Sequence, residues 1–242
     1  MQGIGNRYLI HYRFIKFVNN KVCYQTYSVP HMKSVIISGG SKGLGKALSN
    51  VMGNDGWKVL TFSRSIEESG NEPNGSVFTM RADLRLDRDI VSVVNRANML
   101  FGKTDLLILN AGTIMECRNV LESTVADLRR LFEVNVFANY YLMRTFLEAN
   151  PNGTVVHVTS DAARQHFPGW GVYGASKAVM DFLIEAVAAE EGNLKAFSID
   201  PGDMDTEMHR IADPSSDREA LQSPELAAVK FYEKLKEVLR IE

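Results

Sequence analysis

Cysteine is scarce in this sequence, which has only Cys23 and Cys117 among its 242 residues. Two cysteines do not provide the disulfide framework of a small secreted domain, so a reducing, cytoplasmic environment is the default expectation. Long apolar runs are also missing, and no stretch is long enough to span a bilayer as a helix. The sequence therefore predicts neither a disulfide-stapled domain nor a membrane protein, and no metal-ligating cluster stands out.

A strong excess of charge is missing as well. The chain has 27 Lys and Arg residues against 29 Asp and Glu residues, for a formal net charge of -2. Such a balance gives no electrostatic reason to expect nucleic acid or an anionic membrane as a partner. Hydrophobic residues make up 45% and charged residues 23% of the chain, which is ordinary for a globular protein. The length suits one domain, or one domain with an appendage.

The first 31 residues differ in character from the rest. Residues 8–18 are aromatic and basic, without the clean apolar segment of a secretory signal. A strand or hairpin is the expected local structure. Because His31-Met32 is what a common cloning junction encodes, residues 1–31 are interpreted either as a vector-derived leader or as a genuine N-terminal extension that covers a sheet edge or a partner subunit. The folded domain is expected over residues 32–242.

Apolar, β-branched runs alternate with helical patterns through this domain. Strands are predicted at 33–37, 56–62, 77–82, 106–109, 154–159 and 195–199, and helices at 46–52, 88–101, 128–147, 175–189 and 224–240. Residues 66–76 and 208–223 are polar and are predicted to form loops. The alternation predicts a single-domain α/β fold with a Rossmann-type, doubly wound parallel sheet.

A glycine-rich turn lies between the first strand and the first helix. Gly39, Gly43 and Gly45 follow the spacing Gly-x-x-x-Gly-x-Gly. Glycines there let the backbone approach a pyrophosphate closely, and the helix N-terminus offers free N–H groups and the positive end of its dipole. A dinucleotide site is the favoured interpretation, and an ordinary strand–helix turn is the alternative.

A second group of residues surrounds the fifth predicted strand and the helix after it. Ser160 follows the strand, and Tyr173 and Lys177 are four residues apart at the start of the helix, so they share a face. An ammonium beside a phenol favours the phenolate and should lower the pKa of Tyr173, which would let it exchange a proton near neutral pH. The alternative is a packed tyrosine with a solvated lysine.

Five motifs, in this order, resemble those of the short-chain dehydrogenase/reductase family. They are the glycine loop, Asn110-Ala111-Gly112, Asn135 within a predicted helix, Ser160 with Tyr173-x-x-x-Lys177, and Pro201-Gly202 followed by Thr206. The resemblance covers residues 33–206. Leu109 departs from the family, which has a further Asn at that position. A seventh strand, which most members have near the C-terminus, is expected to be absent.

The resemblance implies a nicotinamide cofactor. Ser63-Arg64-Ser65 after the second strand has no carboxylate for a ribose 2′-hydroxyl, whereas Arg64 and Lys42 match positions that the family uses for NADP(H), so NADP(H) is predicted over NAD(H). Both cations are solvated surface residues in the alternative interpretation. The predicted cofactor-binding residues are Gly39, Ser41, Lys42, Gly43, Leu44, Gly45, Arg64, Asp83, Leu84, Asn110, Ala111, Gly112, Tyr173, Lys177, Pro201, Gly202 and Thr206.

The implied function is that of an oxidoreductase that transfers a hydride between NADP(H) and a small-molecule carbonyl or secondary alcohol. The resemblance makes Tyr173 the general acid/base, Lys177 its partner and a ribose ligand, and Ser160 the residue that orients the substrate oxygen. Asn135 would hold a water that links Lys177 to solvent; Asn139, one turn later, is the competing candidate. A non-catalytic NADP(H)-sensing regulator and a structural interaction module on the same fold are the alternatives.

The sequence leaves the substrate and the oligomeric state less defined. Residues 113–117, 162–170 and 206–212 are expected to line the substrate pocket, but they indicate no substrate class. A homo-oligomer is expected. A dimer through the helices at 128–147 and 175–189 is favoured, because one interface of the family's usual tetramer uses the seventh strand, and a tetramer is the alternative.

Overall fold

The computed structural model describes residues 9–18, 21–30, 33–68, 75–192 and 194–240. The chain divides into two compact units, Met1–Lys33 and Ser34–Glu242. In the first unit, β1 (Leu9–Val18) and β2 (Lys21–Pro30) pair in antiparallel register, with Tyr12 opposite Tyr27. This agrees with the expected strand or hairpin. The origin of the segment, as leader or extension, stays a prediction.

The second unit is built on a six-stranded parallel sheet, which confirms the predicted fold class. Its strands are β3 (Ser34–Ser38), β4 (Lys58–Ser63), β5 (Val77–Arg81), β6 (Leu106–Leu109), β7 (Thr154–Val158) and β8 (Ala196–Ile199). The spatial order is β5-β4-β3-β6-β7-β8, so the direction of winding reverses between β3 and β6. Ligands of doubly wound sheets bind at such a reversal, beyond the carboxyl ends of the strands. The described residues add no seventh strand to this sheet.

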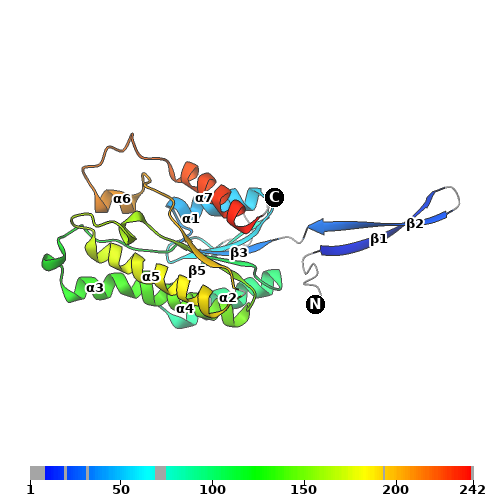
Figure 1. Cartoon of the computed structure of the whole chain (residues 1–242), viewed down its shortest axis with the longest axis horizontal. Helices are drawn as coiled ribbons and strands as arrows, with labels where there is room; N and C mark the ends of the chain where they lie inside the picture. Colours follow the sequence, from blue (N-terminus) through cyan, green and yellow to red (C-terminus); the bar gives the residue numbers. More distant parts are fainter. Residues whose placement is uncertain (1–8, 19–20, 31–32, 69–74, 193, 241–242) are drawn as a thin grey trace. The chain divides into compact units, whose positions relative to one another are not determined.

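Helices cover both faces of the sheet (Figure 1). One face packs against α1 (Gly43–Asn54) and α7 (Pro224–Leu239), and the other against α2 (Asp87–Phe101), α4 (Asn139–Ala149) and α5 (Gly171–Glu190). Side chains alternate along each strand, so Val35 and Ile37 lie in the first core layer and Ile36 in the second. None of the described helices is long and apolar enough to cross a membrane.

The helix predicted over residues 128–147 is interrupted. It consists of α3 (Val125–Phe132), a π-helical turn (Glu133–Ala138) and α4. Single π-helical turns are uncommon and often lie at functional sites. Asn135 lies inside this turn and Asn139 directly follows it. Apolar periodicity does not distinguish a π-turn from an α-turn, which is why the interruption was not predicted.

Two further helical segments differ from the predictions. The helix α5 begins at Gly171, so Tyr173 lies in its first turn; the alanine-rich pattern that predicted the helix starts only at Ala175. Residues 208–223 were predicted to be a loop, but α6 (Glu207–Ala212) lies at the start of this range. The side chain of Thr206 accepts a hydrogen bond from the His209 N–H at 3.2 Å and caps this short helix.

Candidate active site

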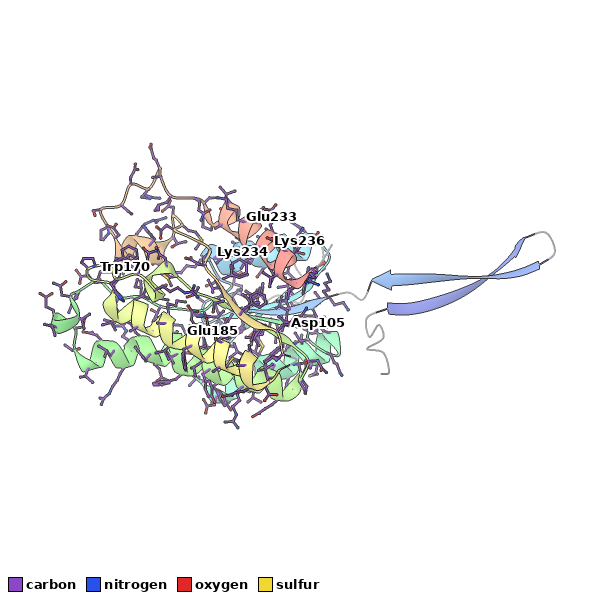
Figure 2. The ribbon with its side chains drawn as sticks, in the orientation of Figure 1. Asp105, Trp170, Glu185, Glu233, Lys234 and Lys236 are labelled. Atoms are coloured by element: carbon purple, nitrogen blue, oxygen red, sulfur yellow. The ribbon has the colours of Figure 1, made fainter. Side chains whose placement is uncertain are left out.

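The predicted functional residues gather at one edge of the sheet. Most of them follow the carboxyl ends of β3, β4, β5, β6, β7 and β8, which all point the same way because the sheet is parallel, and the others lie on α5 and in the π-helical turn. Figure 2 shows the two ends of the second unit: Trp170 lies toward the end that holds these loops, and Asp105, just before β6, lies toward the other. The fold therefore brings together motifs that are far apart in the sequence.

The glycine loop has the close approach that a diphosphate site requires. Gly39 has φ of 79°, a conformation that favours glycine, and its N–H donates to Phe62 O at 2.9 Å. A Cβ at Gly45 would overlap the carbonyl oxygen of Gly39. No side chain of the described residues caps the N-terminus of α1, so its first N–H groups are available to an anion. The other predicted loop residues, Ser41, Lys42, Gly43 and Leu44, lie at this same turn.

Asn110 ties the two central strands together, as expected. Its Nδ2 donates to Ser38 O at 2.8 Å, and the Ser38 hydroxyl accepts from the N–H groups of Asn110 and Ala111 at 3.0 and 2.9 Å. A Cβ at Gly112 would lie 3.7 Å from Lys177 Nζ. The Asn-Ala-Gly segment therefore spans the distance from the glycine loop to the predicted catalytic lysine.

The residues predicted to meet the adenosine end lie after β4 and β5. Arg64 is exposed, and Leu84 is buried. The Asp83 carboxylate is bound by the Arg85 guanidinium, with Nη2 and Oδ2 2.6 Å apart. This hydrogen bond lowers the pKa of Asp83 to about 2, and the charges of Arg85 and Arg64 act in the same direction. Arg85, which the sequence analysis missed, thus places a second arginine at this end of the site.

Lys42 has a partner that the sequence did not predict. Its ammonium forms an ion pair with Glu207, the first residue of α6. Close by, a Cβ at Gly43 would lie 3.5 Å from the Thr206 methyl group. Pro201 and Gly202 begin the segment that leads there from β8, and the carbonyl of Pro201 accepts from Gln222 Nε2 at 2.8 Å. The predicted Thr206 position is therefore next to the glycine loop, and the Pro201-Gly202 segment leads to it from β8.

Tyr173 and Lys177 lie on one face of α5, beside the end of β7. Lys177 Nζ donates to Val158 O at 2.7 Å and lies 5.9 Å from the centroid of the Tyr173 ring. Both side chains are buried. Ser160 follows β7, and its hydroxyl donates to Asp161 Oδ1 at 3.1 Å. The structure thus brings together the three residues that the spacing singled out.

The pKa of Tyr173 shifts in the direction opposite to the one expected. Burial raises it above its ordinary value, the charges of Asp200 and Asp161 add to this rise, and a hydrogen bond with Ser160 opposes it. Burial also lowers the pKa of Lys177 to about 8, against the charges of Asp181 and Asp200. The expectation of a lowered Tyr173 pKa was wrong for this structure because it considered the neighbouring ammonium and not the loss of solvent.

Asn135 is buried and its side-chain amide is hydrogen-bonded within the protein. The Oδ1 accepts from the Thr113 N–H at 2.7 Å, and the Nδ2 donates to Thr113 O at 2.9 Å and to Ser176 Oγ at 3.0 Å. Asn135 therefore joins the loop after β6 to α5, and its role in holding a water stays a prediction. The Nδ2 of Asn139, the competing candidate, donates instead to Ala111 O at 2.9 Å.

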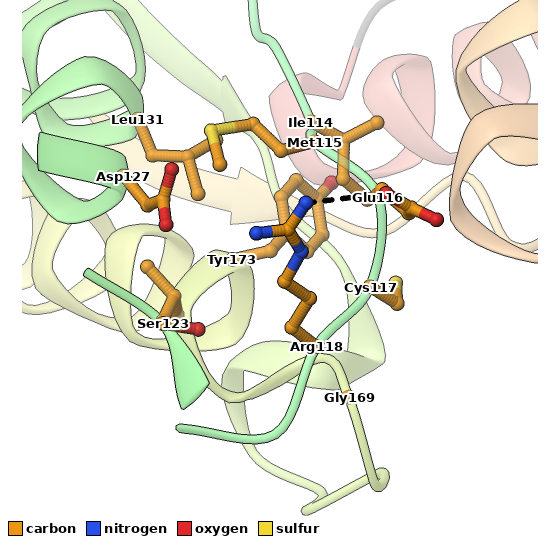
Figure 3. Close-up of a pocket in the computed structure, with 11 residues that line it drawn as sticks. Ile114, Met115, Glu116, Cys117, Arg118, Ser123, Asp127, Leu131, Gly169 and Tyr173 are labelled. Atoms are coloured by element: carbon orange, nitrogen blue, oxygen red, sulfur yellow. Dashed lines mark hydrogen bonds and ion pairs between the residues drawn. The ribbon is translucent and has the colours of Figure 1, made fainter. Parts of the chain in front are cut away.

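A small pocket lies against the Tyr173 ring (Figure 3). Arg118 extends across it and pairs with Glu116 at 3.3 Å. The lining residues are Ile114, Met115, Glu116, Cys117, Arg118, Ser123, Asp127, Leu131, Gly169, Val172 and Tyr173. The Trp170 ring lies close to two aromatic side chains, with its centroid 5.8 Å from that of Tyr173 and 6.5 Å from that of His209 on α6. Parts of the first two predicted lining segments thus lie near Tyr173, and the third, with His209, lies against Trp170.

Comparison with known proteins agrees with this geometry. Residues 33–216 match the sequence profile of the family described as short chain dehydrogenase. An uncharacterized oxidoreductase of Saccharomyces cerevisiae is 32% identical over 183 residues, covering 73% of this chain and 72% of the relative. Sepiapterin reductase of Meriones unguiculatus is 30% identical over 213 residues, covering 79% of each chain.

A solved structure shows the same fold. The alcohol dehydrogenase of Thermococcus sibiricus, in complex with 5-hydroxy-NADP, superposes with a TM-score of 0.75 at 23% identity, over 87% of this chain and 92% of that one. The family comprises oxidoreductases that bind nicotinamide cofactors and act on CH–OH or C=O groups of small molecules. With its profile matched over residues 33–216, this chain belongs to the short-chain dehydrogenase/reductase family.

Proposed function

We propose that the protein is an NADP(H)-dependent oxidoreductase of small carbonyl compounds or secondary alcohols, with Tyr173 as the general acid/base. The observation that carries the proposal is the position of Tyr173. Its ring lines the pocket, Lys177 lies 5.9 Å from its centroid on the same helix, and Ser160, just after the end of the neighbouring strand, acts to lower its pKa.

The residues of the site have separate roles in cofactor binding and proton transfer. The glycine loop and the N-terminus of α1 would hold the diphosphate, and Lys177 would hold the nicotinamide ribose. When bound, the cofactor supplies or accepts the hydride. In the reducing direction, the Tyr173 hydroxyl donates its proton to the carbonyl oxygen, which the Ser160 hydroxyl orients. Because burial raises the pKa of Tyr173, the phenol retains its proton at neutral pH, as a proton donor must.

The preference for NADP(H) rests on the charges at the adenosine end. Residues 63–65 after β4 contain Arg64 and no carboxylate, and Lys42 is exposed in the glycine loop. A 2′-phosphate suits such cations, whereas a free 2′-hydroxyl suits a carboxylate. The ligand of the Thermococcus sibiricus structure, 5-hydroxy-NADP, is a derivative of NADP.

The outer faces of the π-helical turn, α4 and α5 support a homodimer. Phe137, Tyr140, Val179 and Phe182 are exposed there, and Phe182 is 72% exposed. The turn and α5 pack against each other. Large exposed apolar side chains that gather on adjoining elements mark interaction surfaces. A second copy of this chain is the proposed occupant, and a cytoplasmic location is proposed with it.

The test combines cofactor binding with turnover. Purified protein is titrated with NADPH and NADH by nicotinamide fluorescence and then assayed against a panel of ketones and aldehydes. Tyr173→Phe should abolish turnover and leave NADPH affinity within about twofold, because the phenol hydroxyl is a reacting group. Tyr141→Phe, on α4, is the matched control and should keep full activity.

Each other outcome has a distinct meaning. Turnover retained by Tyr173→Phe would refute the assignment of the acid/base. Tight NADPH binding by wild-type protein, without turnover of any substrate in either direction, would favour the regulator. Tighter binding of NADH than of NADPH would overturn the cofactor preference alone.

A further inference from the structure

Two side chains on successive turns of α5 hold the end of β7. Lys177 Nζ donates to Val158 O at 2.7 Å. One turn later, Asp181 Oδ1 lies 2.9 Å from His157 Nδ1, and its Oδ2 accepts from Thr159 Oγ1 at 2.7 Å. Three consecutive residues of the chain, 157–159, are therefore fixed to α5. Ser160 is the next residue.

This group is buried. His157 is 0% exposed and Asp181 6%. A buried carboxylate is stable only when its oxygens are well bonded. Because a carboxylate only accepts hydrogen bonds, the hydrogen between the two side chains belongs on Nδ1 of a neutral His157. Burial lowers the pKa of His157 to about 4, which agrees with the neutral form. The Nε2 is buried and has no hydrogen-bond partner among the described residues.

The Asp181 charge acts on the predicted catalytic lysine. The charged or titratable groups that face Lys177 are Asp181 on its own helix, Asp200 after β8, His157 on β7 and the phenol of Tyr173. Burial favours the neutral amine, and of these groups Asp181 and then Asp200 favour the ammonium. A neutral His157 carries no positive charge that would offset the Asp181 carboxylate, so the negative charge of Asp181 also acts on Lys177.

We propose that Asp181 is a positioning residue for the catalytic pair. Held by His157 and Thr159, it fixes α5 against the strand end that precedes Ser160, and its negative charge stabilises the Lys177 ammonium. This inference rests on the proposed function for its catalytic consequence, but its electrostatic part concerns the protein alone. A purely structural buried pair would affect folding stability and leave the ionisation of Lys177 unchanged.

The decisive variant is Asp181→Asn, which keeps the shape and removes the charge. The pKa of Lys177 is measured in cofactor-free protein by NMR of 13Cε-labelled lysine, with the signal assigned from its loss in Lys177→Met. We expect the pKa of Lys177 to fall by at least about half a unit in Asp181→Asn. Glu190→Gln removes an exposed carboxylate at the end of the same helix and should leave the pKa of Lys177 unchanged.

The pH profile of kcat/KM provides the second measurement. If the reaction needs the Lys177 ammonium, the rate declines as pH rises through its pKa, and this decline should move to lower pH in Asp181→Asn by the same amount as the NMR value. Near pH 6, where Lys177 is protonated in both proteins, kcat should fall less than at pH 8 and KM should change little.

The outcomes separate this inference from the proposed function. An unchanged Lys177 pKa in folded Asp181→Asn would overturn the inference even if wild-type protein is an active reductase. A lowered Lys177 pKa in Asp181→Asn, together with wild-type protein that turns over no substrate, would support the electrostatic inference and refute the proposed function. If Asp181→Asn does not fold, the ionisation of Asp181 is followed instead in wild-type protein, by NMR of 13Cγ-labelled aspartate. Asp181 must stay ionised throughout the titration of Lys177, and a protonated Asp181 there would overturn the inference.

Discussion

The Lys42 ammonium in the glycine loop is paired with the Glu207 carboxylate at the start of α6. This contact joins the predicted diphosphate site to the segment expected to cover the substrate. Both side chains are largely exposed, 70% and 60%, and exposed pairs contribute little to stability. Little free energy is therefore lost when Lys42 leaves Glu207 and pairs with a ligand phosphate instead. The ion pair is compatible with a cofactor-binding role for Lys42.

We predict that Lys42→Ala weakens NADPH binding by about tenfold, the value of one charge-assisted contact, and leaves NADH binding within about twofold. The dissociation constants are measured by nicotinamide fluorescence. Lys103→Ala is the control, because Lys103 is exposed and lies at the opposite edge of the sheet, before β6. An equal loss of affinity for both cofactors would show that Lys42 does not recognise the 2′-phosphate.

Gly174→Ala should displace the turn that carries Ser160. A Cβ at Gly174 would overlap the carbonyl oxygen of Ala162, which belongs to the backbone and cannot rotate away. We expect kcat to fall by about tenfold or more, because small displacements of reacting groups are costly, while NADPH affinity is kept. Gly192→Ala, where the added atom has no neighbour within 4 Å, is the matched control. Wild-type kcat in Gly174→Ala would contradict the proposed role of Ser160.

The buried His157 should make the protein sensitive to acid. Its pKa is about 4 in the folded protein and 6.5 ordinarily, so the unfolded chain binds more protons between these values. The free energy of unfolding should therefore fall as pH drops from 6.5 to 4, by up to about 3 kcal/mol. Asp181, whose pKa is lowered, contributes in the same direction at lower pH.

Urea denaturation at pH 7, 5.5 and 4.5 measures this effect. His157→Asn keeps a donor toward Asp181 and cannot become charged, so the loss of stability between pH 6.5 and 4 should be smaller in this variant. An equal loss in both proteins would exclude His157 as its source.

We predict that Phe182→Glu converts a dimer into monomers, because burying an unpaired carboxylate at the interface is unfavourable. Sedimentation velocity measures the oligomeric state. Met99→Glu is the control, since Met99 is also exposed, at 79%, but lies on α2, away from the proposed interface. A wild-type monomer, or a Phe182→Glu protein that stays dimeric, would refute the proposed interface.

Much of the fold was predictable because its signals are local. The run 106–109 is wholly apolar and became the buried strand β6, and the glycine spacing marked the turn after β3. The family and the doubly wound parallel sheet were confirmed. The helix α6 was missed because it is only six residues long and its start depends on one hydrogen bond to Thr206.

The site was predictable where spacing along one helix determines proximity, as for Tyr173 and Lys177. Asp181 continues the same spacing by four more residues, and this signal was available in the sequence. Its partner His157 lies on another element, and only the register between β7 and α5 brings the two together. The pKa of Tyr173 was unpredictable for a similar reason, because the dominant cause is burial by the whole fold.

The π-helical turn at Glu133–Ala138 bears on attempts to make this protein more stable. Removing one residue would restore an ordinary α-helix. The same deletion would rotate Asn135 by about 100° relative to Asn139, because each residue of an α-helix turns the chain by that angle. The two asparagines would then no longer both face the loop after β6. The irregular turn is therefore a place where the chain retains a less regular helix in order to keep its site assembled.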